Sequence, residues 1–157
     1  MEHVVFFDLI IGLLIATTVI NKRLNILENI FILITLEFII TGYVAVLTIN
    51  LGLWEMAKNA EPYTILRLHE IIILPVLYLW YFNLLDAFKS LLGKSVLTLG
   101  ALLIFYGSEY LLVRWNVITY NSWNAWYSIF VLFGVIIFIQ LLRRGFKHRM
   151  LKEGIPN

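Results

Sequence analysis

Cysteine is absent from this chain of 157 residues, and charged residues are scarce. Without a thiol the chain forms no disulfide, no iron–sulfur cluster and no thiolate nucleophile. The three histidines lie far apart in the sequence, which excludes a haem site built from helices with two histidines each. Charged side chains make up 14% of the residues, against roughly 25% in an ordinary soluble domain. So few charges cannot cover the surface of a soluble fold of this size.

Hydrophobic residues are abundant instead. They make up 61% of the chain, against an ordinary ~45–50%, and the mean hydropathy is +0.88. A surface of this kind suits lipid, so the sequence indicates an integral membrane protein, and its length indicates a single domain.

Five apolar segments approach the length that a membrane-spanning helix needs, which is about 20 residues for a hydrocarbon core of ~30 Å. We predict an all-α, polytopic bundle whose spans are residues 4–20, 30–53, 62–88, 95–115 and 125–142, with a basic tail over residues 143–157. Pro62 suits the first turn of the third helix, whereas Pro75 should bend it. We expect the first segment to be a retained helix and not a signal peptide, because no Lys or Arg precedes it.

The basic residues predict the orientation of the bundle. Nine of the twelve fall on one side of this topology, which the positive-inside rule makes cytoplasmic. They are Lys22, Arg23, Lys89, Lys94, Arg143, Arg144, Lys147, Arg149 and Lys152. The N-terminus is then outside and the C-terminus inside, and most Trp residues fall at the outer interface, where aromatic side chains gather.

Acidic residues inside the spans are the candidate functional groups, since an Asp at the centre of a spanning helix costs about 2.5–3.5 kcal/mol. Glu37 is the deepest, with Thr41 on the same helix face, and we expect it to face protein or water. Six further groups map to the outer leaflet and complete a candidate buried polar or ion site. They are Asp8, Arg67, His69, Glu70, Glu109 and Arg114.

Two interpretations of these groups stay open. They form either an internal ion-pair network that holds the helices together or a site for a proton, a cation or a basic ligand group. Arg67 and Glu70 are spaced to pair within one helix. His69 and Glu70 are adjacent and diverge around the helix, so we expect no metal site. Asp86 and Lys89 are expected to form an interfacial ion pair.

Two other patterns concern packing and lipid contact. Gly93, Gly100 and Gly107 recur every seven residues, and this seam is expected to let the fourth helix pack closely within the bundle, with a dimer face as the alternative. Basic residues of the tail are expected to touch the headgroups of anionic lipids. They are Arg143, Arg144, Lys147 and Arg149.

The second half of the chain, from Pro62 to Leu142, resembles a family of small uncharacterised multi-pass membrane proteins of spore-forming Gram-positive bacteria, the Bacillales and Clostridia. The residues that carry the resemblance are Glu70 followed by Pro75 at the start of the third span, and Glu109 followed by RWNVITYNSW from Arg114 to Trp123. The resemblance implies a fold and a bacterial cell-membrane location, but no activity.

The sequence therefore favours a non-enzymatic accessory or partner-binding component of the bacterial membrane. The alternative is a channel or transporter that handles protons or cations through Glu37 with Asp8, Glu70 and Glu109. We expect no catalytic set, no cofactor and no nucleic-acid partner. Expected partners are the lipid bilayer, with anionic lipids at the tail, and either another membrane protein or further copies of this chain.

The predicted topology is testable because the chain has no cysteine of its own. The variant Asn121→Cys should react with an impermeant maleimide added from outside the cell, whereas Ser90→Cys should react only after permeabilisation. The reverse labelling pattern would contradict the orientation.

Overall fold

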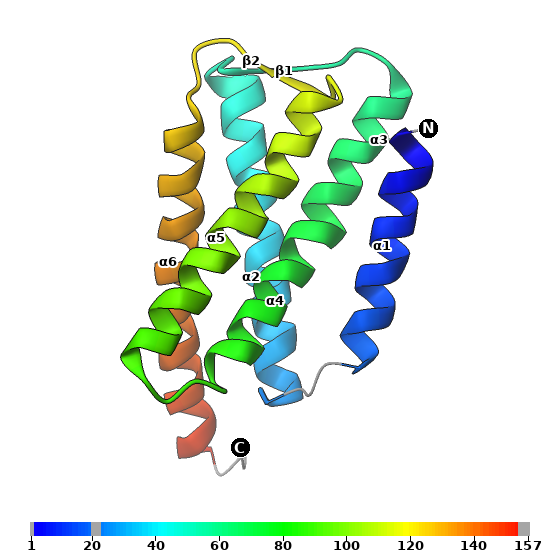
Figure 1. The fold of residues 1–157 in the computed structure, drawn as a ribbon. Coiled ribbons are helices and arrows are strands. Elements are labelled where there is room, and N and C mark those ends of the chain that lie inside the picture. Colours follow the sequence, from blue (N-terminus) through cyan, green and yellow to red (C-terminus); the bar gives the residue numbers. More distant parts are fainter. Residues whose placement is uncertain (1, 20–22, 154–157) are drawn as a thin grey trace.

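The described part of the chain is a bundle of five helical rods with a small two-stranded sheet at one end (Figure 1). The computed structural model describes residues 2–19 and 23–153. About 81% of the chain is helical, so the predicted all-α class is confirmed. We call the end that carries the sheet the strand end, and the end where the last helix finishes at Lys152 the tail end.

The rods follow the predicted segments closely, and two of them contain a π-helical turn. The first is α1 (Glu2–Val19), and the second is α2 (Ile26–Ala45) with η1 (Val46–Asn50). The third consists of α3 (Ala60–Leu68), η2 (His69–Ile73) and α4 (Leu74–Leu85), and the last two are α5 (Leu91–Arg114) and α6 (Ala125–Lys152). The strands are β1 (Trp54–Met56) and β2 (Ile118–Tyr120).

Four of these rods are long and apolar enough to cross a membrane, namely those over Ile26–Asn50, Ala60–Leu85, Leu91–Arg114 and Ala125–Lys152. These four helices fit a multi-pass membrane protein. The apolar stretch of α1, Val4–Val19, is shorter, so the crossing of the first segment stays a prediction.

Polar caps and prolines explain where several helices begin. The Asn25 side chain accepts a hydrogen bond from the Leu27 amide, and the Ser90 hydroxyl accepts one from the Gly93 amide at 3.1 Å. Pro62 lies in the first turn of α3, as predicted. Pro75, which has no N–H, is the second residue after the wide turn η2, at whose end the Leu74 amide bonds to the His69 carbonyl. The structure thus accommodates Pro75 by a π-helical turn.

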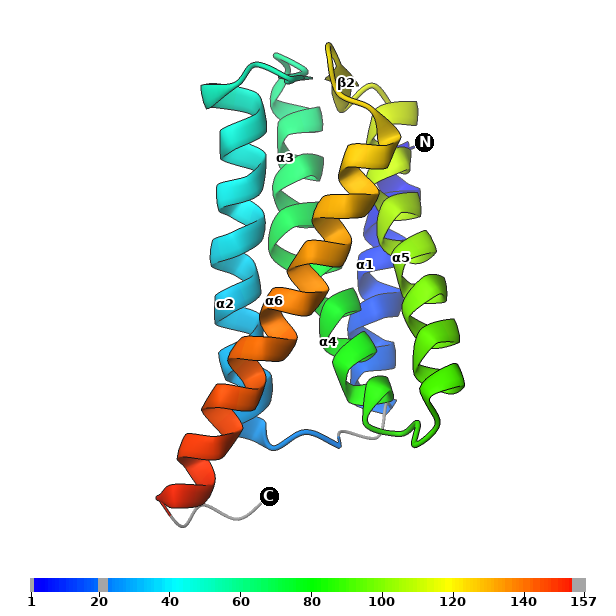
Figure 2. The ribbon, with the colours of Figure 1, turned by 90° about the vertical axis from the view of Figure 1, so that its left-hand side faces the viewer.

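The third rod lies at the centre of the bundle (Figures 1 and 2). In its most hydrophobic stretch 61% of the residues are buried, against 22–28% in the other long rods. The Tyr78 ring stacks on Phe105 of α5 with ring centroids 4.1 Å apart, and its hydroxyl donates to the Leu132 carbonyl of α6 at 3.0 Å. One tyrosine of α4 thus joins three rods.

Three corrections to the predicted boundaries follow. The segment 116–124, which lies between the predicted spans 95–115 and 125–142, contains β2, which pairs antiparallel with β1 so that Trp54 lies opposite Tyr120. The final helix continues through Lys152, so most of the tail over residues 143–157 is helical, and residues 154–157 lie outside the described part. The second helix begins at Ile26 and not at residue 30, because Asn25 caps it.

The predicted glycine seam is wrong as a packing surface within the chain. A Cβ atom added at Gly100 or Gly107 would meet no atom within 4 Å. At Gly93, by contrast, it would lie 2.8 Å from Phe88 Cδ1 and 2.9 Å from the Ser90 Oγ that caps α5. Only Gly93, in the turn before the spanning part of α5, is closely surrounded.

The variant Gly107→Ala should therefore raise the free energy of unfolding in detergent micelles, by about 0.5–1 kcal/mol, because alanine loses less backbone entropy in a helix. Gly93→Ala is the matched control and should give no such gain, since its new methyl group would displace the Phe88 ring. A marked loss of stability in Gly107→Ala would instead support the hypothesis that the glycine seam is a close-packed surface.

Candidate functional site

At the strand end a network of hydrogen bonds surrounds the buried carboxylate of Glu109 on α5. The Tyr120 hydroxyl of β2 donates to its Oε1 atom at 2.5 Å, and the Ser128 hydroxyl of α6 donates to the same oxygen. The Trp123 Nε1 group in turn donates to Ser128 Oγ at 2.8 Å. Donors from β2 and α6 therefore converge on one acid of α5, and the loop residue Trp123 joins this network through Ser128.

Tyr120 is suited to this donor role. Burial and the neighbouring charge of Glu109 raise the pKa of Tyr120 above its ordinary value. Its phenol therefore keeps its proton at neutral pH and continues to donate to the carboxylate.

His69 lies beside this network and is held to α5 from the third rod. Its Nε2 atom is 3.0 Å from the Ser108 hydroxyl, and its side chain is buried. His69 and Glu109 line the same small cavity, together with Tyr43 and Trp54. The Tyr43 hydroxyl and the Trp54 Nε1 group are buried and make no hydrogen bond with another described residue. The cavity volume of about 10 Å³ corresponds to a single water molecule, which is too small for an organic ligand.

A second buried acid, Glu70, has a separate partner. The Arg67 guanidinium donates to its Oε2 atom at 2.6 Å, which confirms the pairing expected from their spacing. Arg67 also donates to the Tyr63 hydroxyl at 3.0 Å and lies over the Tyr63 ring. The other carboxylate oxygen of Glu70 is buried without a hydrogen bond from the described residues.

The predicted polar site is thus divided between several places. The structure brings His69 and Glu109 together and pairs Arg67 with Glu70. It leaves Asp8 of α1 and Arg114 of α5 exposed. Four residues predicted for this site take no part in the buried network, namely Asp8, Arg114, Glu37 and Thr41.

Glu37 does not face the interior of the bundle, and the expectation that it faces another protein or water stays a prediction. The buried face of α2 carries Leu36 and Ile40, and Glu37 is turned about 100° away from Leu36. Its side chain is exposed and lines a shallow groove of about 520 Å³ on the outer surface of α2. Thr41 lies in the same groove, so the predicted shared face of the two residues is confirmed.

The tail end holds a buried ion-pair cluster that the sequence did not predict. The Arg143 guanidinium of α6 makes two contacts to the Asp86 carboxylate, one of them 3.1 Å long, and lies 3.5 Å from the Glu28 carboxylate of α2. Arg143 and Glu28 are both buried. Arg143 is therefore not a headgroup contact, and Asp86 pairs with it and not with Lys89. Contact with anionic lipid stays a prediction for Arg144, Lys147 and Arg149.

Asn83 of α4 anchors the loop that precedes α2, and sequence reasoning missed this role. Its Oδ1 atom accepts hydrogen bonds from the backbone amides of Arg23 at 3.0 Å and Leu24 at 3.2 Å. Its Nδ2 group donates to Asn29 Oδ1 at 3.0 Å and to the Leu79 carbonyl at 2.9 Å. The sequence signal for this role was an Asn within an otherwise apolar helix, because a buried side-chain amide needs several hydrogen-bond partners.

The described residues were searched for a metal-binding cluster, and the chain was compared with known proteins. Within residues 2–19 and 23–153 no three His, Asp or Glu side chains gather closely enough to hold a metal ion. Comparison with protein-family models, with curated proteins and with solved structures found no match for this chain. The resemblance suggested by the sequence therefore stays a prediction.

The tail-end cluster predicts a large effect of one substitution. Arg143→Met should lower the free energy of unfolding by roughly 3–5 kcal/mol, because it leaves the buried Glu28 carboxylate without its cation. Arg144→Met, at an exposed position next to it, should change stability by less than about 0.5 kcal/mol. Unfolding in mixed micelles measures both, and equal effects would refute the role of the buried pair.

Proposed function

We propose that this chain is a non-enzymatic component of the bacterial cell membrane that binds a spanning helix of another membrane protein along the groove of α2. The observation that carries the proposal is the exposure of Glu37 near the middle of the 25-residue rod Ile26–Asn50. This depth corresponds to the hydrocarbon core. We infer the occupant from the chemistry of that surface.

A carboxyl group facing hydrocarbon is unfavourable by about 2.5–3.5 kcal/mol on insertion scales. The Glu37 side chain makes no hydrogen bond or ion pair with another residue that the structure describes. A partner helix that brings a hydrogen-bond donor or a basic side chain to Glu37 removes this cost. The acid then acts as a polar contact that orients the partner, as polar groups do between spanning helices.

The surroundings of Glu37 suit the close approach of a helix. Gly42 and Ala45 line the same groove, with Thr41 as a second polar group. A Cβ atom at Gly42 would have open space around it, so no part of the chain that the structure describes packs against the position. Small residues of this kind allow the backbones of two helices to come together in lipid.

A different protein fits this surface better than a second copy of the chain. A copy related by a two-fold axis would place its own Glu37 against the first, without a cation between them. Arg67 and Arg143 are paired with Glu70 and with the tail-end acids. The other basic residues of the rods lie toward the ends of α5 and α6 and not at the depth of Glu37, namely Lys94, Arg114, Arg144, Lys147, Arg149 and Lys152. The cation or donor must therefore come from another sequence.

The structure gives less support to the alternative role in proton or cation handling. That role requires Glu37, Asp8, Glu70 and Glu109 to lie along one path. Glu37 and Asp8 are exposed on α2 and α1, while Glu70 and Glu109 are buried with separate partners. Partner binding needs only the exposed groove, so we prefer it.

Photo-crosslinking in native membranes tests the proposal. A photoreactive residue in place of Phe38, which is 83% exposed beside the groove, should give an adduct with another protein. Adding Glu37→Leu should reduce the adduct yield at least fivefold, because the polar contact is lost, whereas Glu37→Gln should retain most of it.

The matched control is a photoreactive residue in place of Leu103 on α5, which is also strongly exposed. It should give lipid adducts only. Equal protein adducts from both positions, a yield independent of Glu37, or an adduct of twice the mass of the chain would overturn the proposal.

A further inference from the structure

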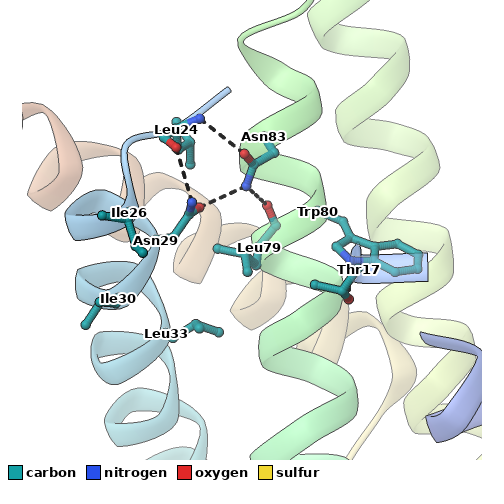
Figure 3. Close-up of a pocket in the computed structure, with 9 residues that line it drawn as sticks. All are labelled: Thr17, Leu24, Ile26, Asn29, Ile30, Leu33, Leu79, Trp80 and Asn83. Carbon is teal, nitrogen blue, oxygen red and sulfur yellow. Dashed lines mark hydrogen bonds between the residues drawn. The ribbon is translucent and has the colours of Figure 1, made fainter. Parts of the chain in front are cut away.

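A crevice at the tail end, distinct from the groove of Glu37, separates α2 from α4 and the end of α1 (Figure 3). Its volume is about 370 Å³, which is within the range of ligand pockets. Most of its lining is apolar and includes Ile30 and Leu33 of α2 and Leu79 of α4. Trp80 forms part of the wall toward α1.

The polar groups in the wall are already paired with one another. The Trp80 Nε1 group donates to Thr17 Oγ1 at 2.9 Å, and Thr17 donates to the Leu13 carbonyl at 2.8 Å. Asn83 and Asn29 are bonded to each other, and the Asn29 amide donates to the Leu24 carbonyl at 3.2 Å (Figure 3). The crevice therefore offers an occupant apolar contacts and no hydrogen bonds. An acyl chain matches that chemistry.

A basic residue adjoins the crevice. Arg23 directly precedes Leu24, a lining residue, and its backbone amide is fixed on Asn83. Its side chain is exposed and makes no hydrogen bond or ion pair with another residue in the described ranges. The nearest acid along α2, Glu28, is buried against Arg143. A guanidinium anchored one residue away from the lining of an apolar crevice can reach and complement a phosphate group there.

We propose that this crevice binds an anionic phospholipid, with one acyl chain between α2 and α4 and the phosphate on Arg23. The hydrogen bonds of Asn83 keep the backbone of Arg23 next to the acyl crevice, since Asn83 lines the crevice and also accepts from the Arg23 amide. The site is therefore selective for headgroup charge, unlike the general lipid contact of an exposed helix.

Fluorescence quenching by phospholipids brominated in the acyl chain tests the site, because Trp80 lies in its wall. The purified protein is placed in phosphatidylcholine vesicles that contain either brominated phosphatidylglycerol or brominated phosphatidylcholine. The signal of Trp80 is obtained as the difference between the wild type and Trp80→Phe. Brominated phosphatidylglycerol should bind about fivefold more tightly than brominated phosphatidylcholine, because one basic residue near an anionic headgroup strengthens binding by about that factor.

Three variants separate the site from general surface effects. Arg23→Gln should abolish the headgroup preference, and Lys94→Gln, an exposed change on α5 outside the crevice, should keep it. Ile30→Phe, at a position 47% exposed that tolerates a larger side chain, should weaken quenching by both lipids because it fills the crevice. Equal quenching by both lipids in the wild type, or the same loss in Lys94→Gln as in Arg23→Gln, would overturn the proposal.

Discussion

In hydrocarbon, a charged side chain must find its partner within the protein, because no water is present to solvate it. The described structure satisfies this constraint at both ends of the bundle. At the strand end Glu109 accepts hydrogen bonds from Tyr120 and Ser128, and at the tail end Arg143 binds two carboxylates. Each cluster joins elements that are distant in sequence, so the packing of the rods depends on them.

The central position of the third rod follows from the same constraint. Its π-helical turn carries His69 and Glu70, and both are buried, although adjacent residues of a helix ordinarily diverge. His69 bonds to α5 while Glu70 pairs with Arg67 on its own rod. Farther along the rod, Asn83 fixes the loop before α2. One helix thus supplies polar contacts along most of its length.

The surface of α2 presents an exposed acid at mid-span that has no partner among the described residues. Glu37 lies in a groove formed with small residues, and the crevice near Arg23 opens between α2 and α4. The two surfaces differ chemically, because the groove presents an acid to an incoming helix and the crevice presents apolar walls below a cation. A partner helix and a phospholipid can therefore occupy α2 together.

The sequence by itself determined the membrane class, the helical fold and the approximate bounds of the rods, because hydrophobicity and helix length are local properties. It also predicted the pair of Arg67 with Glu70, whose three-residue spacing sets their distance within one helix. Only the tertiary structure decided the direction of Glu37, the burial of Arg143, the open space at Gly107 and the pairing of β1 with β2. Each of these depends on which neighbouring rod covers a given helix face, and in a chain that is apolar on all sides the hydrophobic pattern does not mark that face.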